Sequence, residues 1–385
     1  MKFKNMLSGL LACALAVTSA FAGNVSTVKA VEPAADGAAV RAGELQAGKY
    51  YIVNAAQGGF LNGGNSWGTQ ASALPYGELM EVVYDGGKTY LKYGTYFFKS
   101  DGFLDGDNNK KAAFSIDACE DGSYTIALED KSAYFTASAD NTVVTLAALD
   151  DPADPSEYAK WKFLTREAYI AEITAVSSDN GVDVTSLVGD ANFTRNNPNY
   201  SLWNATKTEG ANNFGKVGKN ENNCHEGYHN KFTLAQTIEG IPNGIYELNV
   251  QGAHQNANDS PVYYINGTEH PLKLMTDEAN PPGDANAFSD AFSQGRYFNT
   301  PIRAVVTNNK LTIGLKMDQL DDWVIWDGFT LKYIPTSDKT YQESLDKIEK
   351  PSILGTNQGY QRIRSNLVLP TDIGKMLDGI NLSIT

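Results

Sequence analysis

The chain of 385 residues is poor in the residue types that cross-link small domains or hold metal clusters. It has three cysteines and four histidines. Three cysteines cannot form a disulfide framework in a chain of this length, so packed apolar cores must stabilise the fold. Basic residues are outnumbered as well, with 31 Lys and Arg against 45 Asp and Glu and a net charge of −14. A nucleic-acid-binding protein would present a basic surface to the phosphates, so the composition does not favour that class.

Long apolar runs are also missing, and nothing in the sequence reaches the roughly 20 apolar residues that a membrane-spanning helix needs. The nearest case is residues 6–17, which follow two lysines and precede a group of small residues at 20–22. This order is typical of a signal peptide, and we predict one over residues 1–22. The four residues ending at Cys13 also resemble a lipoprotein cleavage box, which leaves lipidation as an alternative. Either interpretation predicts export, to the periplasm, the cell surface or the extracellular space.

What the sequence does contain favours strands and turns. It has 20 Tyr, 16 Phe and 35 Gly, and aromatic residues are enriched in strands while glycine is enriched in turns. After a leader over residues 23–45 that we expect to be flexible, a weak threefold repeat starts at Tyr50, Tyr90 and Tyr124. Each copy reads as strand, turn, strand. Because no single copy could bury its own apolar face, the three are expected to close on one another as a β-trefoil-like domain over residues 46–166.

The rest of the chain divides into three parts. The first is a short segment rich in alanine and isoleucine, which predicts a helical connector over residues 167–181. Residues 182–335 show strands, turn signals and no helical periodicity, which predicts a β-sandwich. Their first part, residues 192–230, is crowded with asparagine and is expected to form turns but little core. The tail over residues 336–385 has too few apolar residues to form a domain alone. The clearest strands are expected at residues 232–238, 245–253, 262–265, 302–306, 311–315 and 324–334.

The one catalytic motif runs from His225 through Glu226 to His229 and has the H-E-x-x-H spacing of zinc proteases. In those enzymes a helix places both histidines on one face, with the glutamate beside the metal-bound water. Here Gly227 interrupts the motif and asparagine-rich segments flank it, so a helix is not expected. We therefore interpret the motif as a chance match, with a metal-dependent hydrolase as the less favoured alternative. His225 and His229 remain candidates for a looser metal or sugar site.

The strand expected near residues 322–333 contains one carboxylate in a costly position. By the two-residue period of a strand, Ile325, Asp327 and Phe329 share a face that is expected to point inward. A buried carboxylate needs a cation or several hydrogen-bond donors. A structural Ca²⁺ with oxygen ligands would satisfy Asp327, and a local turn hydrogen bond is the alternative.

Two segments resemble the galactose-binding-like jelly-roll β-sandwiches, the fold of many carbohydrate-binding modules. Residues 185–193, followed by Trp203, look like the opening of such a sandwich. Residues 326–331 look like its closing strand. That strand usually reads Asp-Asn-Phe, so Gly328 is a departure from the pattern.

Three further segments resemble secreted multi-domain proteins of polysaccharide-degrading gut bacteria. They are residues 63–71, 222–232 and 241–248. The resemblance implies that Asp327, with Asn192, lies near the structural calcium position of such modules. It also implies that the H-E-x-x-H motif lies in a loop.

Aromatic side chains beside polar ones are the candidates for ligand binding. The C–H face of a pyranose ring stacks on an aromatic ring while polar neighbours bind its hydroxyls. In the first domain the candidate is Trp67, with Asn65 and Gln70 as polar partners. In the sandwich the candidates are Trp203, Tyr228, His229 and Trp323.

The sequence therefore predicts an all-β, exported and non-catalytic protein. Its expected partner is a glycan or polysaccharide at or outside the cell surface, and its expected cofactor is at most a structural Ca²⁺. The alternative is a structural or adhesive surface protein whose partner is another protein. Neither a nucleic-acid partner nor a transmembrane segment is expected.

Overall fold

The structure is a computed structural model that describes residues 45–65, 69–139, 142–176, 181–193, 201–218, 223–257 and 261–335. The predicted signal peptide with Cys13, nearly all of the predicted leader and the tail lie outside these ranges. Within them strands predominate, and the α-helices are α1 (Arg166–Ala175) and α2 (Ala285–Ser293), so the predicted all-β class is confirmed. Among the described residues, no helix combines the length and the hydropathy needed to cross a bilayer.

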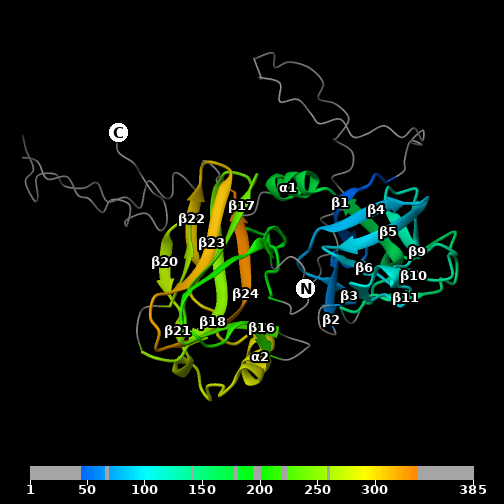
Figure 1. The fold of residues 1–385 in the computed structure, drawn as a ribbon. Coiled ribbons are helices and arrows are strands. Elements are labelled where there is room, and N and C mark those ends of the chain that lie inside the picture. The colour runs from blue at the N-terminus through cyan, green and yellow to red at the C-terminus, as the bar shows by residue number, and fades with distance from the viewer. Residues whose placement is uncertain are drawn as a thin grey trace, which may run out of the picture. The chain divides into compact units, whose positions relative to one another are not determined.

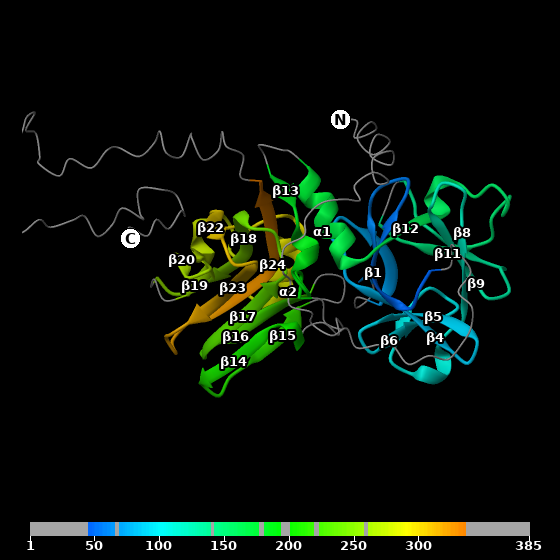
Figure 2. The same cartoon turned by 90° about the horizontal axis from the view of Figure 1, so that it is seen from above.

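The first twelve strands form one sheet in which six strands close into a ring (Figure 2). The ring contains, in order, β1 (Gly48–Asn54), β4 (Met80–Asp85), β5 (Lys88–Tyr93), β8 (Phe114–Ala118), β9 (Tyr124–Leu128) and β12 (Lys160–Leu164), which pairs with β1 again. Three hairpins complete the sheet: β2 (Phe60–Asn65) with β3 (Gln70–Leu74), β6 (Tyr96–Phe98) with β7 (Leu104–Asp105), and β10 (Tyr134–Thr136) with β11 (Thr145–Ala147). Short 3₁₀ turns are η1 (Asn108–Lys110) and η2 (Glu157–Ala159).

The repeat seen in the sequence coincides with this topology. Tyr50, Tyr90 and Tyr124 lie in β1, β5 and β9, each the first of four consecutive strands. Each tyrosine thus marks the first strand of one of three consecutive groups of four strands, and the β-trefoil-like character of this unit stays a prediction. Apolar side chains fill the ring, and fully buried Trp161 donates from Nε1 to the carbonyl oxygen of Phe135 at 2.9 Å.

Helix α1 follows the ring, in the region where a helical connector is expected. Thr165 caps its N-terminus by accepting a 3.1 Å hydrogen bond from the backbone N–H of Ala168. Tyr169 and Ile173, one turn apart, are its buried side chains.

Two sheets follow α1 and pack face to face as a β-sandwich (Figure 1). The five-stranded sheet has the order β14 (Asn204–Glu209), β17 (Lys231–Glu239), β23 (Lys310–Met317), β19 (Val262–Ile265) and β20 (Thr268–Pro271). The seven-stranded sheet has the order β15 (Phe214–Gly218), β16 (Asn223–Tyr228), β24 (Trp323–Ile334), β18 (Gly244–His254) and β21 (Lys273–Leu274), with β13 (Val182–Asp183) on β24 and β22 (Ile302–Val306) on β18. The 3₁₀ turns here are η3 (Thr185–Leu187) and η5 (Met275–Asp277).

The asparagine-rich segment corrects the expectation of turns with little core. It contains β14, β15 and β16, and β16 lies inside the seven-stranded sheet between β15 and β24. Trp203, Cys224 and His225 from this segment are buried. Pairing with β24, which is about a hundred residues away in sequence, overrides the weak local strand preference of asparagine.

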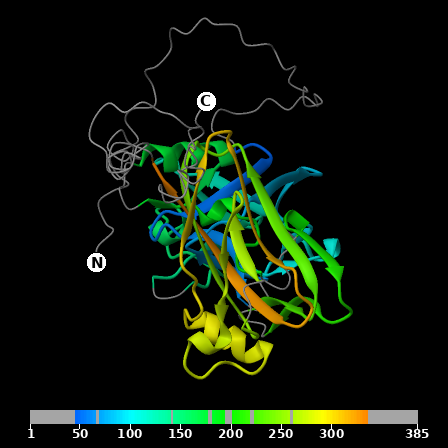
Figure 3. The ribbon, with the colours of Figure 1, turned by 90° about the vertical axis from the view of Figure 1, so that its left-hand side faces the viewer.

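Helix α2 also departs from the expectation of no helix in the sandwich. Its N-cap is Asp284, which accepts from the N–H of Ala287 at 2.9 Å. Phe288, Ala291 and Phe292 are buried on one side of it. Figure 3 shows the helix, in yellow, at one end of the two sheets. With only nine residues, it offers too few repeats of a helical period to be recognised in sequence.

A β-bulge in β24 changes which face Asp327 occupies. Val250 pairs with Phe329 and Gly252 with Trp326, so one residue of β18 lies opposite two residues of β24. Trp326 and Phe329 therefore both face the sandwich core, and Asp327 points to the outer face of the seven-stranded sheet. The expectation that Asp327 shares an inward face with Ile325 and Phe329 is wrong, because the bulge shifts the alternation by one residue.

Candidate functional site

Three of the predicted ligand residues meet where β16 ends and β24 begins, and we call Tyr228, His229 and Trp323 the aromatic end site. Tyr228 and Trp323 are paired across the two strands. The ring of Tyr228, which is 40% exposed, stacks on His229 at 4.2 Å between centroids and 21° between planes. It meets the indole of Trp323 edge-on at 6.4 Å. The exposed tyrosine ring is thus held by two aromatic neighbours.

The backbone around this ring is fixed by hydrogen bonds. His229 has a φ of 51°, a left-handed conformation in which histidine is found more often than most residues. Its N–H donates to the carbonyl oxygen of Asp322 at 2.8 Å. Buried Asn230 donates from Nδ2 to the carbonyl oxygens of Asn213 at 2.6 Å and Tyr228 at 2.9 Å. Hydrogen bonds to the backbone therefore fix the turn that places His229 against Tyr228.

Trp323 is positioned from both sides. Its Nε1 donates to Glu226 Oε2 at 2.9 Å, and Glu226 Oε1 accepts from Asn213 Nδ2 at 3.4 Å. Phe288 of α2 meets the indole edge-on at 5.5 Å. Trp323 is only 9% exposed. It therefore supports the Tyr228 ring and offers little surface of its own to a ligand.

Asp322 ties the loop before β24 to the loop after β18. Its carboxylate is fully buried and accepts from His254 Nδ1 and the N–H of Gln255 at 2.9 Å each, and from the N–H of Asn256 at 3.0 Å. Burial alone would raise the pKa of Asp322, but the hydrogen bonds from His254 and the two backbone N–H groups outweigh it and lower the pKa. The group is therefore ionised at neutral pH. Sequence reasoning did not single it out, because its partners come from a distant loop.

Several exposed polar side chains lie on the segments next to the aromatic end site. Asn213, Gln255, Asn256 and Asp321 are exposed on the segments that these hydrogen bonds connect. They carry amide donors and acceptors and one carboxylate, and none of them is basic. The arrangement can stack a ring on Tyr228 and hydrogen-bond its substituents.

The H-E-x-x-H motif does not form a zinc site. It lies in and just after strand β16, not in a loop as the resemblance implied. His225 is fully buried, whereas His229 lies at the turn after β16, stacked on the exposed ring of Tyr228, so the two imidazoles do not face a common position. His225 lies in the core, stacked on Trp326 at 4.5 Å, and burial lowers its pKa to about 3. Among the described residues, no group of three or more His, Cys, Asp or Glu is placed to hold a metal.

The other predicted ligand residues lie elsewhere. Trp203 is in the sandwich core, where Nε1 donates to the carbonyl oxygen of Gly189 at 2.8 Å, so it has no open face for a ligand. Gln70 lies in β3 and is half-buried. Asn65 ends β2, but its side chain and all of Trp67 lie outside what the structure describes.

Asn192 and Asp327, the predicted calcium ligands, line one cavity of about 310 Å³. Asn192 Nδ2 donates to the hydroxyl of Tyr76 at 2.6 Å. Burial and the nearby carboxylates of Glu78 and Asp327 raise the pKa of that tyrosine. Calcium at this position stays a prediction.

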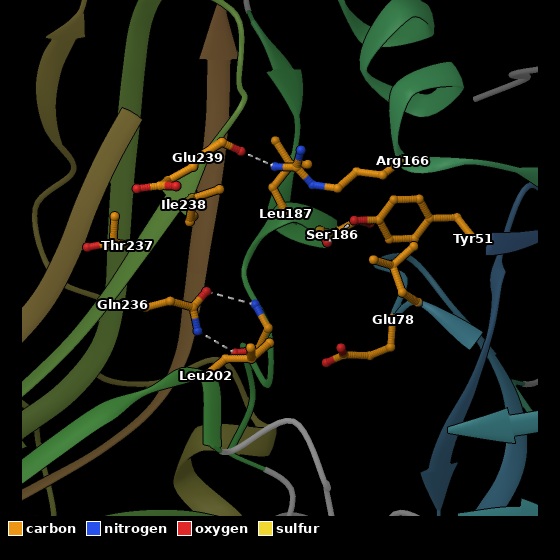
Figure 4. A pocket seen from close by; sticks show the side chains of 12 residues that line it. Tyr51, Glu78, Arg166, Ser186, Leu187, Leu202, Gln236, Thr237, Ile238 and Glu239 are labelled. Atoms are coloured by element: carbon orange, nitrogen blue, oxygen red, sulfur yellow. Dashed lines mark hydrogen bonds between the residues drawn. The ribbon is translucent and has the colours of Figure 1, made fainter. Parts of the chain in front are cut away.

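A separate cavity of about 310 Å³ lies beside α1 and β17 (Figure 4). Arg166 Nη2 donates to the carbonyl oxygen of Glu239 at 2.6 Å. The Gln236 amide exchanges two 2.9 Å hydrogen bonds with the backbone of Gly189. Tyr51 donates to the carbonyl oxygen of Ser186 at 2.9 Å. These polar groups satisfy one another, and none of the predicted ligand residues lines this cavity.

No protein family model matches this chain, and no curated protein does. A family 61 carbohydrate-binding module solved with β-1,4-galactotriose is 14% identical; the match covers 35% of this chain and 90% of that chain, with a TM-score of 0.23. A family 35 carbohydrate-binding module from Clostridium thermocellum is 18% identical over 33% of this chain and 87% of that chain, with a TM-score of 0.21. The K1 cleaved adhesin domain of Lys-gingipain from Porphyromonas gingivalis is 14% identical over 41% of this chain and 96% of that chain, with a TM-score of 0.21.

Proposed function

We propose that this chain is a non-catalytic glycan-binding protein and that a sugar ring stacks on Tyr228 in the aromatic end site. The observation that carries the proposal is an exposed tyrosine ring held in place by His229 and Trp323, with exposed amides and a carboxylate on the adjoining segments. A pyranose presents an apolar C–H face to such a ring and directs hydroxyls at the polar groups around it. Rigidity favours binding, because little side-chain entropy is lost when the ligand docks.

The charges around the site indicate the kind of glycan. Asp321 is exposed in the segment just before Trp323, and the carboxylate of Glu226 accepts the hydrogen bond of the Trp323 indole. An anionic sugar would be repelled by these carboxylates and by the net charge of −14 on the whole chain. We therefore expect a neutral glycan. With the predicted export signal, the place of action would be the cell surface or the space outside it.

A glycan array probed with the full chain tests this proposal. Tyr228→Ala should weaken binding to any glycan that the wild type retains by at least about tenfold, which corresponds to about 1.4 kcal/mol. The matched control is Tyr84→Ala, since Tyr84 is also an exposed tyrosine, 49% accessible, but lies in β4 of the ring. It should bind like the wild type. Wild-type protein that retains no glycan, or Tyr228→Ala that binds as the wild type does, would overturn the proposal.

A further inference from the structure

The cavity that contains Asn192 and Asp327 lies on the outer face of the seven-stranded sheet, where the β-bulge interrupts β24. None of its lining residues belongs to the aromatic end site. Gln251 and Gly328 form part of its wall, and Phe298, 36% exposed, also lines it. It is thus a second concave surface, built from other residues.

Two amide oxygens converge on the same part of this cavity. Gln251 uses both hydrogens of its amide nitrogen, which donates to the carbonyl oxygens of Phe292 at 2.8 Å and Arg296 at 2.7 Å. Its Oε1 therefore points the other way, and a Cβ placed on Gly328 would lie 3.7 Å from it. The Asn192 amide donates to the hydroxyl of Tyr76, which also lines the cavity. The Oδ1 of Asn192 would lie 3.5 Å from the same Cβ.

Gly328 keeps the space between these oxygens open. Its φ lies outside the left-handed range, so its backbone conformation does not require glycine. Nothing nearer than 3.5 Å would meet an added Cβ. This is also the position at which the closing strand departs from the Asp-Asn-Phe pattern. The absence of a side chain here leaves two oriented acceptors facing a cavity.

The chemistry of the walls defines the ligand class. Asn192 Oδ1 and Gln251 Oε1 can only accept hydrogen bonds, so a neutral ligand beside Gly328 must bring donors. Phe298 supplies an apolar surface beside them. A volume of about 310 Å³ is at the lower end of the range for small-molecule sites and suits one ring.

We propose that this cavity binds a single neutral sugar residue through its hydroxyl donors, as a second site in addition to the aromatic end site. The ligand class is that of the proposed function, on which this inference rests. The residues are different, however, so the two sites are tested by different substitutions.

The experiment measures binding of free monosaccharides, namely galactose, glucose, mannose and N-acetylglucosamine, to the full chain by saturation-transfer NMR and calorimetry. Gly328→Val should reduce the affinity for the bound monosaccharide by at least about tenfold, because its side chain occupies the space between the two amide oxygens. Gly328→Ala should give a smaller loss. The matched control is Gly283→Ala, because a Cβ there would meet nothing within 4 Å. Unchanged thermal unfolding of Gly328→Ala would show that the sheet is intact.

Tyr228→Ala separates the two proposals. If monosaccharide binding survives Tyr228→Ala and is lost in Gly328→Val, the second site is supported. If it is lost in Tyr228→Ala and unchanged in Gly328→Val, this inference is overturned and the aromatic end site stands. The inference is also overturned if the wild type binds none of the four sugars. It is overturned as well if the cavity binds Ca²⁺ but no sugar, and Gly328→Val abolishes that Ca²⁺ binding.

Discussion

The indole nitrogen of Trp323 donates a 2.9 Å hydrogen bond to the carboxylate of Glu226, across the paired strands β24 and β16. This contact orients the ring that meets Tyr228 edge-on. Glu226 is thereby a positioning residue: it holds Trp323 in place and leaves the stacking surface to Tyr228.

Replacement of Glu226 should weaken glycan binding in proportion to the loss of this hydrogen bond. Glu226→Ala leaves the buried indole N–H without its acceptor, and we expect an affinity loss of about threefold to tenfold. Glu226→Gln keeps an acceptor oxygen and should bind within about twofold of the wild type. Calorimetric titration with an array-selected glycan measures both. Equal losses in the two variants would contradict a positioning role through the hydrogen bond.

Asp322 should contribute more to stability than any exposed charge on the chain. Asp322→Ala removes the acceptor of several donors, including the imidazole of His254, and we expect a loss of about 3–5 kcal/mol in the free energy of unfolding. Its pKa is lowered in the folded state, so its ionised form stabilises the fold above the unfolded value of about 3.9. That contribution is lost as the pH falls through the folded value.

Urea unfolding of the wild type and Asp322→Asn across a pH series tests whether the stability contributed by Asp322 is lost on acidification. The stability difference between them should be constant from neutral pH to about pH 5 and shrink below about pH 4. A difference that grows on acidification would contradict it.

His225 should make the protein less stable in weak acid. Because burial lowers its pKa to about 3, the folded state does not take up the proton that the unfolded state binds below about pH 6.5. Stability then falls as the pH decreases, by about 1.4 kcal/mol for each unit between these two values. His225→Phe keeps a ring to stack on Trp326 and removes this titration. Between pH 7 and pH 5 the free energy of unfolding of His225→Phe should rise by about 2 kcal/mol relative to that of the wild type. If the two proteins show the same dependence of stability on pH, His225 does not have a lowered pKa.

Trp203 provides a test that separates the core from the binding surface. It packs against Phe193 at 5.1 Å and Phe329 at 4.9 Å and is 4% exposed. Trp203→Phe should lower the free energy of unfolding by about 1–3 kcal/mol and leave glycan affinity unchanged. Chemical denaturation and the same calorimetric titration give the two readouts. If Trp203→Phe lost glycan affinity while its free energy of unfolding stayed unchanged, Trp203 would be a ligand residue.

Much of the architecture could be predicted from local patterns. The strands at residues 262–265 and 302–306 have the bounds that the sequence indicates, and the tyrosines at 50, 90 and 124 mark equivalent strands of the ring. Of the candidate site, the sequence predicts Tyr228, His229 and Trp323 as ligand residues, because aromatic rings near turns and strand ends are visible in a sequence, and their role in binding stays a prediction. Glu226 and Asp322 were not assigned these roles, because their functions depend on partners from other segments.

The sequence by itself determined the all-β class, the positions of most long strands and the acidic, cysteine-poor character of the chain, because alternation, turn residues and charge are local or additive properties. Only the tertiary structure decided which of those residues are accessible. In the folded chain Trp203 is buried, and strands of the asparagine-rich segment belong to the seven-stranded sheet. Because Gln251 lies opposite both Asp327 and Gly328, the carboxylate of Asp327 faces away from the sandwich core. Pairing between strands distant in sequence sets register and bulges, and a shift of one residue reverses the face that every following side chain occupies.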